Sequence, residues 1–309
     1  MKRVQFSNYG GPEAMAFAEH TLPPLETQRV RVRVKAAAIN PLDWKLRRGV
    51  MKFVTGWKFP LGMGSDFAGV VEEIGADVIN FRVGDEVLGT AEIRRQGAFA
   101  EVVDASAKLI AHKPATLTFS EAACLPIPAA TAWAAIVGVA RAGRGSRILI
   151  HGCSGAVGSY AVQLARAHGA QVCGACGDAS IAAAKAAGVN QAFSYSDKAL
   201  FASDGRYDAV FDTLGTLDVA DGLALLKPKG RLIDINPTPA RMLHGLFSGR
   251  YRMAFSTGGF KNLDDIAKLA GDGKLHPLIG LEAPFSDALS LIEDAEFGRR
   301  PPGRIVLLI

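Results

Sequence analysis

The amino-acid sequence predicts an α/β fold in which an antiparallel, barrel-like β domain precedes a doubly wound parallel sheet. Before about residue 120, short segments alternate apolar and polar residues, as half-solvated antiparallel strands do. From residue 147 onwards, strand patterns alternate with helix patterns, which is typical of a parallel sheet covered by helices. Three glycines, at 152, 155 and 158, separate the first strand of this second region from its first helix.

Strands in the first region are short and are bounded by Gly, Asp, Asn and Pro. The clearest is at residues 29–35, where valines alternate with basic residues. Ser120 is expected to cap an Ala-rich helical run that continues through residues 129–139. We expect further strands at residues 68–74, 86–88 and 98–103.

The second region is expected to contain five strands, each followed by a helix or a turn. The C-terminal segment, residues 275–309, returns to β character, and its end at residues 303–309 is expected to rejoin the first domain as a strand. The strands of the second region are expected at residues 147–151, 171–176, 191–195, 207–212 and 230–235, and the helices at 160–168, 181–187 and 217–226.

The glycine turn is the most informative motif. It has the form Gly152-x-x-Gly155-x-x-Gly158, between an apolar strand and an Ala-rich helix. Glycine allows a tight turn, lets backbone N–H groups approach a pyrophosphate and lets the helix pack closely on the strand, while the helix N-terminus attracts an anion. A glycine triplet alone is weak evidence, because an ordinary tight turn uses the same residues. The alternating strands and helices around it favour a dinucleotide site.

Composition indicates a globular enzyme of two domains. The chain has 309 residues, 49% hydrophobic and 21% charged, and its length exceeds what one hydrophobic core usually supports. It shows no apolar run of membrane-spanning length and no signal-peptide core, so we expect a cytoplasmic protein without membrane contacts. The net charge of +5 is spread thinly, which favours solubility over nucleic-acid binding.

The four cysteines suggest no disulfide framework. Cys173-x-x-Cys176 has a spacing that occurs in zinc and redox sites, but it lies along a predicted strand, where side chains three apart point to opposite faces. No second Cys or His pair lies nearby in the sequence to complete a tetrahedral site. We therefore interpret these thiols as packing groups.

Motifs spread over nearly the whole chain follow the order of a known family. They are Ala38-Ile-Asn-Pro-Leu-Asp-Trp-Lys45 with Gly49, Gly64-Ser-Asp-Phe-Ala-Gly-Val-Val71, Val83-Gly-Asp-Glu-Val87, Gly97-Ala-Phe-Ala-Glu101, Ala129-Ala-Thr-Ala-Trp133, His151-Gly-Cys-Ser-Gly-Ala-Val-Gly158 and Gly303-Arg-Ile-Val-Leu307. Together they resemble the medium-chain dehydrogenase/reductase superfamily and, within it, the zinc-independent quinone oxidoreductase (zeta-crystallin-like) branch. The resemblance implies a GroES-like antiparallel β-barrel domain, residues 1–123 and 275–309, and a Rossmann dinucleotide-binding domain, residues 124–274, in a homodimer.

Zinc is the first question that the resemblance raises, because the alcohol-dehydrogenase branch of the superfamily works on a catalytic zinc. Where that branch has a ligand cysteine this chain has Asn40, and where it has His-Glu this chain has Ser65-Asp66. Residues 89–97 are too short for the structural-zinc lobe and contain no cysteine. Amide and hydroxyl groups are poor zinc ligands, so we expect no metal site.

Without zinc, the resemblance implies hydride transfer from a reduced nicotinamide to a quinone or an α,β-unsaturated carbonyl compound. Asn40 and Thr131 match family positions beside the nicotinamide, although Asn40 can also shape a turn and Thr131 can pack within its helix. Trp44 is either an aromatic wall for a planar acceptor or a core side chain. Asp43 is expected to be an exposed turn carboxylate. No proton donor can be named, and water can serve instead.

The candidate cofactor residues lie in the glycine turn and at the ends of three later strands. NAD enzymes place an acid at the end of the second strand, whereas NADP enzymes place small residues and a base there. This chain has Cys176-Gly177-Asp178, in which Asp178 lies a few residues past the usual acid. We expect NADPH, as in the branch, with NADH open. The candidates are Ser154, Gly155, Ala156, Val157, Gly158, Cys176, Gly177, Tyr195 and Leu214.

A second function stays open at this point. An intact glycine turn is equally compatible with a low-turnover, redox-responsive protein that binds NADPH and a partner. Oxidation of NADPH in the presence of a quinone or an enone separates the two.

Overall fold

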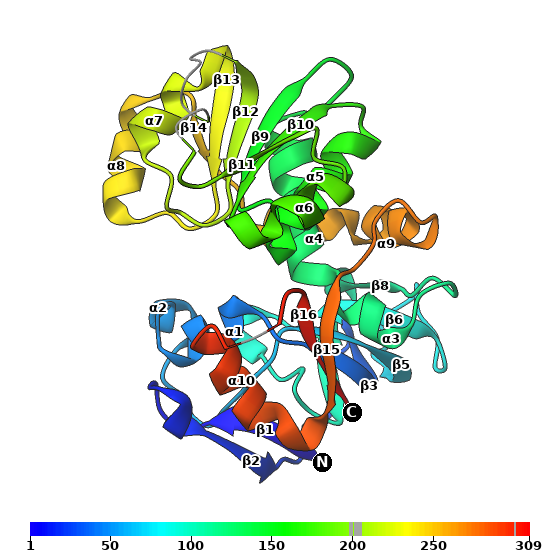
Figure 1. The fold of residues 1–309 in the computed structure, drawn as a ribbon. Coiled ribbons are helices and arrows are strands. Elements are labelled where there is room, and N and C mark those ends of the chain that lie inside the picture. Colours follow the sequence, from blue (N-terminus) through cyan, green and yellow to red (C-terminus); the bar gives the residue numbers. More distant parts are fainter. Residues whose placement is uncertain (198–199, 201–205, 300) are drawn as a thin grey trace. The chain divides into compact units, whose positions relative to one another are not determined.

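The computed structural model describes residues 1–197, 200, 206–299 and 301–309, without the side chains of residues 244, 246 and 247. These residues form two compact units. Figure 1 shows the fold, coloured along the sequence from the N-terminus to the C-terminus. Unit 1 comprises Met1–Ile127, Leu263–Gly271 and His276–Ile309. Unit 2 comprises Pro128–Asn262 and Asp272–Leu275. Within the described ranges, no helix has the length and apolarity that a membrane span requires.

Unit 1 is built on two mostly antiparallel sheets. The larger has seven strands in the order β15-β16-β3-β5-β6-β8, with β7 paired to β3, and the smaller has the order β2-β1-β4. Val30, Val32 and Val34 of β3 are buried while Arg33 and Lys35 are exposed, so the predicted alternation is realised. The strands are β1 (Lys2–Phe6), β2 (Met15–Glu19), β3 (Arg29–Ala38), β4 (Leu61–Gly62), β5 (Asp66–Ile74), β6 (Glu86–Thr90), β7 (Val102–Ser106), β8 (Ile110–His112), β15 (Ile279–Pro284) and β16 (Arg304–Leu308).

The helices of unit 1 are α1 (Pro41–Arg47), α2 (Lys52–Thr55), α3 (Phe119–Ala123), α9 (Leu263–Gly271) and α10 (Ala288–Glu296). The expected cap of α3 at Ser120 is wrong. Thr118 caps the helix, because its hydroxyl accepts from the Glu121 N–H at 3.2 Å and the Glu121 carboxylate accepts from the Thr118 N–H at 2.8 Å. Ser120 lies inside the first turn and is buried.

The C-terminal segment forms the expected strand and a helix that the sequence analysis missed. β16 pairs antiparallel with β3, with Val306 opposite Ala38, so the prediction that the chain's end rejoins the first domain is confirmed. α10 precedes it and buries Ala288, Ile292 and Ala295, which follow one another at spacings of four and three. This spacing is typical of a helix, so α10 could have been predicted from the sequence.

Unit 2 is organised around one parallel sheet. Its six strands have the order β11-β10-β9-β12-β13-β14, which confirms the predicted doubly wound arrangement. The strands are β9 (Arg147–His151), β10 (Gln171–Cys176), β11 (Gln191–Ser194), β12 (Tyr207–Asp212), β13 (Leu226–Asp234) and β14 (Tyr251–Met253). The last of these was not expected.

The helices of unit 2 alternate with its strands. They are α5 (Ala156–Ala167), α6 (Ile181–Ala186), α7 (Val219–Ala224) and α8 (Pro239–Phe247), and α4 (Pro126–Trp133) leads from unit 1 into a π-helix at Ala134–Val139. α5 begins four residues before the expected start, so Gly155 is its N-cap and Gly158 lies inside its first turn. β13 begins at Leu226, four residues before the expected start. Its register against β12 shifts between Tyr207 and Ala209, and this irregularity accommodates the charged residues after Leu226.

Candidate active site

The glycine turn connects β9 to α5 and divides into a buried and an exposed part. Gly152 has a φ of +88°, and a Cβ there would overlap the hydroxyl of Thr213. A Cβ on Gly158 would overlap the carbonyl oxygen of Gly152, so these two glycines serve the close packing of helix on strand. Gly155 is exposed and is the N-cap of the twelve-residue α5, where as a glycine it offers no side chain to the free N–H groups of that helix start. This cradle fits an anion such as a pyrophosphate.

The other candidates in this turn are accessible to different degrees. Ser154 is exposed, Ala156 and Val157 are partly buried, and Gly158 is buried. The stretch from Ser154 to Val157, which is at least partly exposed throughout, is therefore the part of the turn that a ligand can contact.

The end of β10 carries the candidates for the adenosine side of a dinucleotide. Cys176 is completely buried, and burial raises the pKa of its thiol, which faces that of Cys153. Any contact of Cys176 with a cofactor would therefore use its backbone. Gly177 is partly exposed, with a φ of −67° and no atom within 4 Å of an added Cβ, and Asp178 is exposed. All four cysteines are buried free thiols.

His151 lies at the end of β9 and contacts two neighbouring side chains. Its Nε2 lies 3.1 Å from the Thr216 hydroxyl, and its ring lies 4.9 Å from the ring of Tyr195 at 60°. Burial lowers the pKa of His151, which keeps the imidazole neutral at pH 7. The ring of Tyr195, which is 40% exposed, therefore packs against the neutral imidazole of His151 at the ends of the strands.

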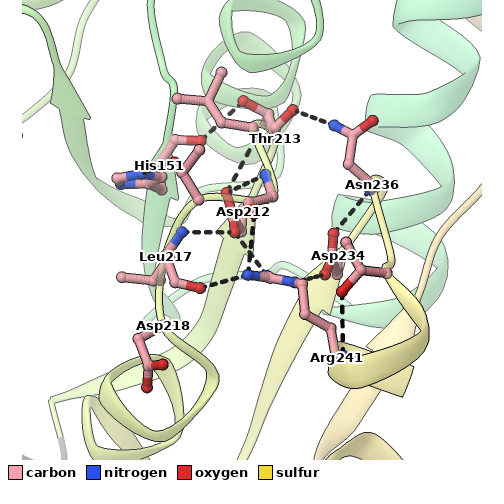
Figure 2. A network of polar contacts seen from close by, with 12 residues as sticks. His151, Asp212, Thr213, Leu217, Asp218, Asp234, Asn236 and Arg241 are labelled. Carbon is pink, nitrogen blue, oxygen red and sulfur yellow. Dashed lines mark hydrogen bonds and ion pairs between the residues drawn. The ribbon is translucent and has the colours of Figure 1, made fainter. Parts of the chain in front are cut away.

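An ion network beneath the loop after β12 was missed by the sequence analysis (Figure 2). Arg241 donates to Asp212 at 2.8 Å and to Asp234 at 2.6 Å, and both carboxylates are completely buried. Tyr251 also donates to Asp234, at 2.8 Å. The sequence contains a signal for this network: an acidic residue ends each of two neighbouring parallel strands, and the arginines Arg241, Arg250 and Arg252 follow.

The same network holds the loop that carries Leu214. Asp212 accepts from the N–H groups of Leu214, Gly215 and Leu217 at 2.9–3.1 Å. Arg241 donates to the carbonyl of Leu217 at 2.6 Å, as Figure 2 shows. Leu214 itself is 43% exposed, so the buried charges fix the backbone of a loop whose apolar side chain faces outward.

Asn40, in unit 1, lies in a second buried polar cluster. Its Nδ2 donates to Asp66 at 2.9 Å and, at 3.3 Å, to the Ala38 carbonyl, while its Oδ1 accepts from Arg304 at 2.9 Å. Burial raises the pKa of Asp66 to about 7, against the opposing effects of Arg304 and Asn40. The amide orientation of Asn40 is thus set on both sides, and only the second lone pair of Oδ1 is left for a ligand.

The expectation that Asp43 is an exposed turn carboxylate is wrong. Asp43 is completely buried at the third position of α1, where it accepts from the Asn40 N–H and from the Ser65 hydroxyl, both at 2.7 Å. Burial raises its pKa to about 6. The carboxylate closes a capping box that holds the start of α1 against Ser65.

The two other catalytic candidates lie in different settings. Trp44 is partly buried and packs against the hydrophobic core of unit 1. Thr131, on α4, is 6% exposed and makes polar contacts within the protein. Packing accounts for both side chains without a ligand, so their roles in the reaction stay predictions.

Comparison with known proteins covers both units. Residues 26–115 match the family described as alcohol dehydrogenase GroES-like domain, and residues 156–236 match the family described as zinc-binding dehydrogenase. The chain is 32% identical to the mitochondrial NAD(P)H oxidoreductase RTN4IP1 of Bos taurus, over 90% of this chain and 82% of that protein. It is 30% identical to the chloroplastic quinone-oxidoreductase homolog of Spinacia oleracea, over 99% and 98% of the two chains.

The solved structures agree with these sequence matches. The quinone oxidoreductase from Coxiella burnetii has a TM-score of 0.90 to this chain at 30% identity, covering 100% of this chain and 99% of that one. The expected combination of a GroES-like domain and a Rossmann sheet is therefore confirmed.

The description of the second family raises the question of whether this chain fits zinc. The predicted ligand positions hold Asn40, whose amide is bonded to Asp66 and Arg304, and Ser65, whose hydroxyl donates to Asp43. Burial raises the pKa of the nearby Cys124 thiol to about 11, so no thiolate is available at neutral pH. Within the described ranges, no three His, Cys, Asp or Glu side chains are grouped to hold a metal ion. The donor set does not fit zinc.

Proposed function

Because the chain belongs to the medium-chain dehydrogenase/reductase superfamily, in its quinone oxidoreductase branch, we propose that it transfers hydride from NAD(P)H to a quinone or an α,β-unsaturated carbonyl compound without zinc. The observation that carries the proposal is the pairing of an open glycine cradle with a polar cluster around Asn40 that offers no zinc ligands. Oxidation of an alcohol needs a group that stabilises the alkoxide, whereas an electron-poor acceptor does not.

The bound nicotinamide would supply the hydride, and the chain's own residues would bind and orient it. The exposed backbone from Ser154 to Val157 and the start of α5 hold the pyrophosphate. Gly177 and Tyr195 lie at the strand ends that hold the adenosine, and Leu214 covers the cofactor from the loop fixed by Arg241.

Asn40 and Thr131 act at the nicotinamide in this proposal. Arg304 fixes the Asn40 oxygen at 2.9 Å and leaves its second lone pair for an N–H of the carboxamide. The Thr131 hydroxyl donates to the acceptor oxygen, and Trp44 borders the acceptor. Water protonates the reduced product, since the acids beside Asn40, namely Asp43 and Asp66, are completely buried and bonded within the protein.

The test is the rate of NADPH oxidation by the purified full chain with and without a simple quinone or enone. We expect a large acceleration by the acceptor, with NADH run in parallel, and no effect of EDTA. The Gly155→Val variant is the control, because it should remove the acceleration by abolishing cofactor binding.

Two results would count against the proposal. About one tightly held zinc per chain by elemental analysis would contradict the zinc-free mechanism. Tight NADPH binding without acceptor-dependent oxidation would favour the redox-responsive binding protein instead. Light scattering on the same sample tests the expected homodimer.

A further inference from the structure

Unit 1 contains a cavity of about 430 Å³ that is separate from the cluster around Asn40, Asp43 and Asp66. It lies beside β1, β4 and the segment between β2 and β3, and residues 94–97 and 102–104 complete its wall. Its charged lining is mainly basic: Arg3, Arg29, Arg94 and Arg95, with Glu26 and Asp104 as the acids and His20 beside them.

Arg3 is the unusual member of this lining. The residue is only 8% exposed, and its Nε donates a hydrogen bond to the Gln5 side-chain oxygen at 3.0 Å. Within the described part of the chain, no carboxylate forms an ion pair with it. Burial lowers the pKa of Arg3. A buried cation without a counter-charge is costly, and an anion in the cavity would relieve that cost.

The acids of the lining are engaged with other cations. Glu26 pairs with Arg95, and both side chains are more than half exposed. Asp104 pairs with Arg31 at 2.8 Å, from the neighbouring strand. These carboxylates therefore leave the positive charge of Arg3 uncompensated.

The remaining basic groups of the lining differ in how firmly they are already bonded to other residues of the protein. Arg29 is bonded to Glu92 at 2.6 Å and to the Asp104 carbonyl, so it is committed to the protein. Arg94 is exposed and forms no ion pair within the described ranges. Exposed pairs such as Arg95–Glu26 contribute little stability, so Arg95 can turn to a ligand at small cost.

We propose that this cavity binds a small molecule bearing carboxylate or phosphate groups, with Arg3 as the buried counter-charge and Arg94 and Arg95 as exposed ones. Guanidinium groups bind both oxyanions through paired, charge-assisted hydrogen bonds. The site is distinct from the proposed pyrophosphate site in unit 2 and from the cluster around Asn40 in unit 1, and its test does not depend on hydride transfer.

The experiment titrates inorganic phosphate and, separately, citrate into the full chain at constant ionic strength, with calorimetry and thermal unfolding as readouts. Both anions should bind and raise the midpoint temperature, and their relative affinity identifies the preferred oxyanion. Arg3→Gln should weaken binding at least about tenfold, and Arg3→Lys should keep part of it. Arg82→Gln is the matched control, since Arg82 is exposed and does not line the cavity.

His20 supplies a spectroscopic readout. Burial lowers its pKa, and the charges of Arg3 and the chain's amino terminus lower it further, while Asp104 raises it. An anion beside Arg3 should therefore raise the pKa of His20, measured by NMR, in wild type and Arg82→Gln but not in Arg3→Gln.

Stability without added anion separates the proposal from a purely structural role of Arg3. An unpaired buried cation predicts that Arg3→Gln is at least as stable as wild type. A markedly less stable Arg3→Gln, or equal stabilisation of wild type and Arg3→Gln by both anions, would overturn the proposal.

Discussion

Arg304 donates a hydrogen bond of 2.9 Å from Nη1 to the side-chain oxygen of Asn40, which lies 264 positions earlier in the chain. Arg304 opens β16, and Asn40 follows the end of β3, the strand with which β16 pairs. The amide that we place at the nicotinamide is therefore oriented only when the last strand has joined the sheet. Asp66, which accepts from the other end of the same amide, is the third member of this arrangement.

Asp66 predicts a specific pH dependence of stability. Its pKa is raised from 3.8 to about 7 by burial, so the folded state holds a proton that the unfolded state releases. This contribution to stability is complete below pH 3.8 and is lost as the pH rises through 7. Each tenfold gain in proton affinity on folding corresponds to about 1.4 kcal/mol of stability that is lost over this range.

The measurement compares wild type with Asp66→Asn by urea unfolding between pH 4 and pH 8. The free energy of unfolding of wild type should fall relative to that of the variant as the pH rises. The titration of Asp43, whose pKa is about 6, also lowers stability as the pH rises. Because Asp43 is present in both proteins, it does not account for a difference between them. The exposed Asp77→Asn is the control and should leave the pH dependence unchanged. A difference between wild type and Asp66→Asn that is independent of pH would contradict the raised pKa.

Arg241 predicts a large loss of stability when its charge is removed. Arg241→Gln would leave the buried carboxylates of Asp212 and Asp234 without their cation. Breaking a buried pair from one side costs about 3–5 kcal/mol. We expect a loss of this size in urea unfolding, together with weaker NADPH binding, because Arg241 also bonds the loop at the Leu217 carbonyl.

Two further variants sharpen this test. Arg241→Lys keeps the charge but lacks the planar fork, so its stability should lie between those of wild type and Arg241→Gln. Arg252→Gln changes an exposed arginine on the neighbouring strand β14 and should have little effect. An Arg241→Gln protein as stable as wild type would show that the network does not support the loop.

The sequence predicted the strands and helices because local patterns of apolar and polar residues determine them. The strands β9, β10 and β12 lie where apolar runs between helices placed them, and the glycine turn follows β9 as expected. The burial of Asp43 was not predictable, because it depends on Ser65, which approaches only in the folded sheet. Arg304 was missed for the same reason: its partner Asn40 is remote in sequence.

The glycine turn predicts different outcomes for two of its members. Gly155 has a φ of −75°, and an added Cβ would come no closer than 3.4 Å to another residue. Gly155→Val should therefore fold normally but lose NADPH binding, because its side chain occupies the space that the pyrophosphate needs. Gly158→Ala should instead lose stability, typically about 1–3 kcal/mol, because its Cβ overlaps the Gly152 carbonyl.

Circular dichroism and thermal unfolding, measured beside NADPH titrations, distinguish these effects. A folded Gly155→Val protein with normal NADPH affinity would mean that the exposed part of the turn is not the pyrophosphate site. A Gly158→Ala protein with unchanged stability would mean that α5 packs on β9 loosely enough to accommodate the added Cβ.

Gly177 and Ala179 allow a test of the expected use of NADPH. An added Cβ at Gly177 meets no atom within 4 Å, and Ala179 is exposed, so Gly177→Ser with Ala179→Arg fits without strain. The pair would add a hydroxyl donor and a charged donor for the 2′-phosphate. Charged hydrogen bonds contribute roughly 1.5–3 kcal/mol each, so NADPH affinity should rise about tenfold or more while NADH changes little. An equal gain for both cofactors would show that these positions do not face the 2′-phosphate.

Asp178 provides the opposite test of cofactor choice. It is exposed at the start of the short helix after β10, a few residues past the usual acid, and a carboxylate near the adenosine ribose would either repel a 2′-phosphate or bond a 2′-hydroxyl. We expect Asp178→Ala to bind NADPH modestly more tightly, since a like charge is removed, and to leave NADH almost unchanged. Titrating both cofactors against wild type and Asp178→Ala measures this, with the exposed Asp221→Ala on α7 as the control for loss of charge. A selective loss of NADH binding would mean that Asp178 holds the ribose and that NADH is the cofactor.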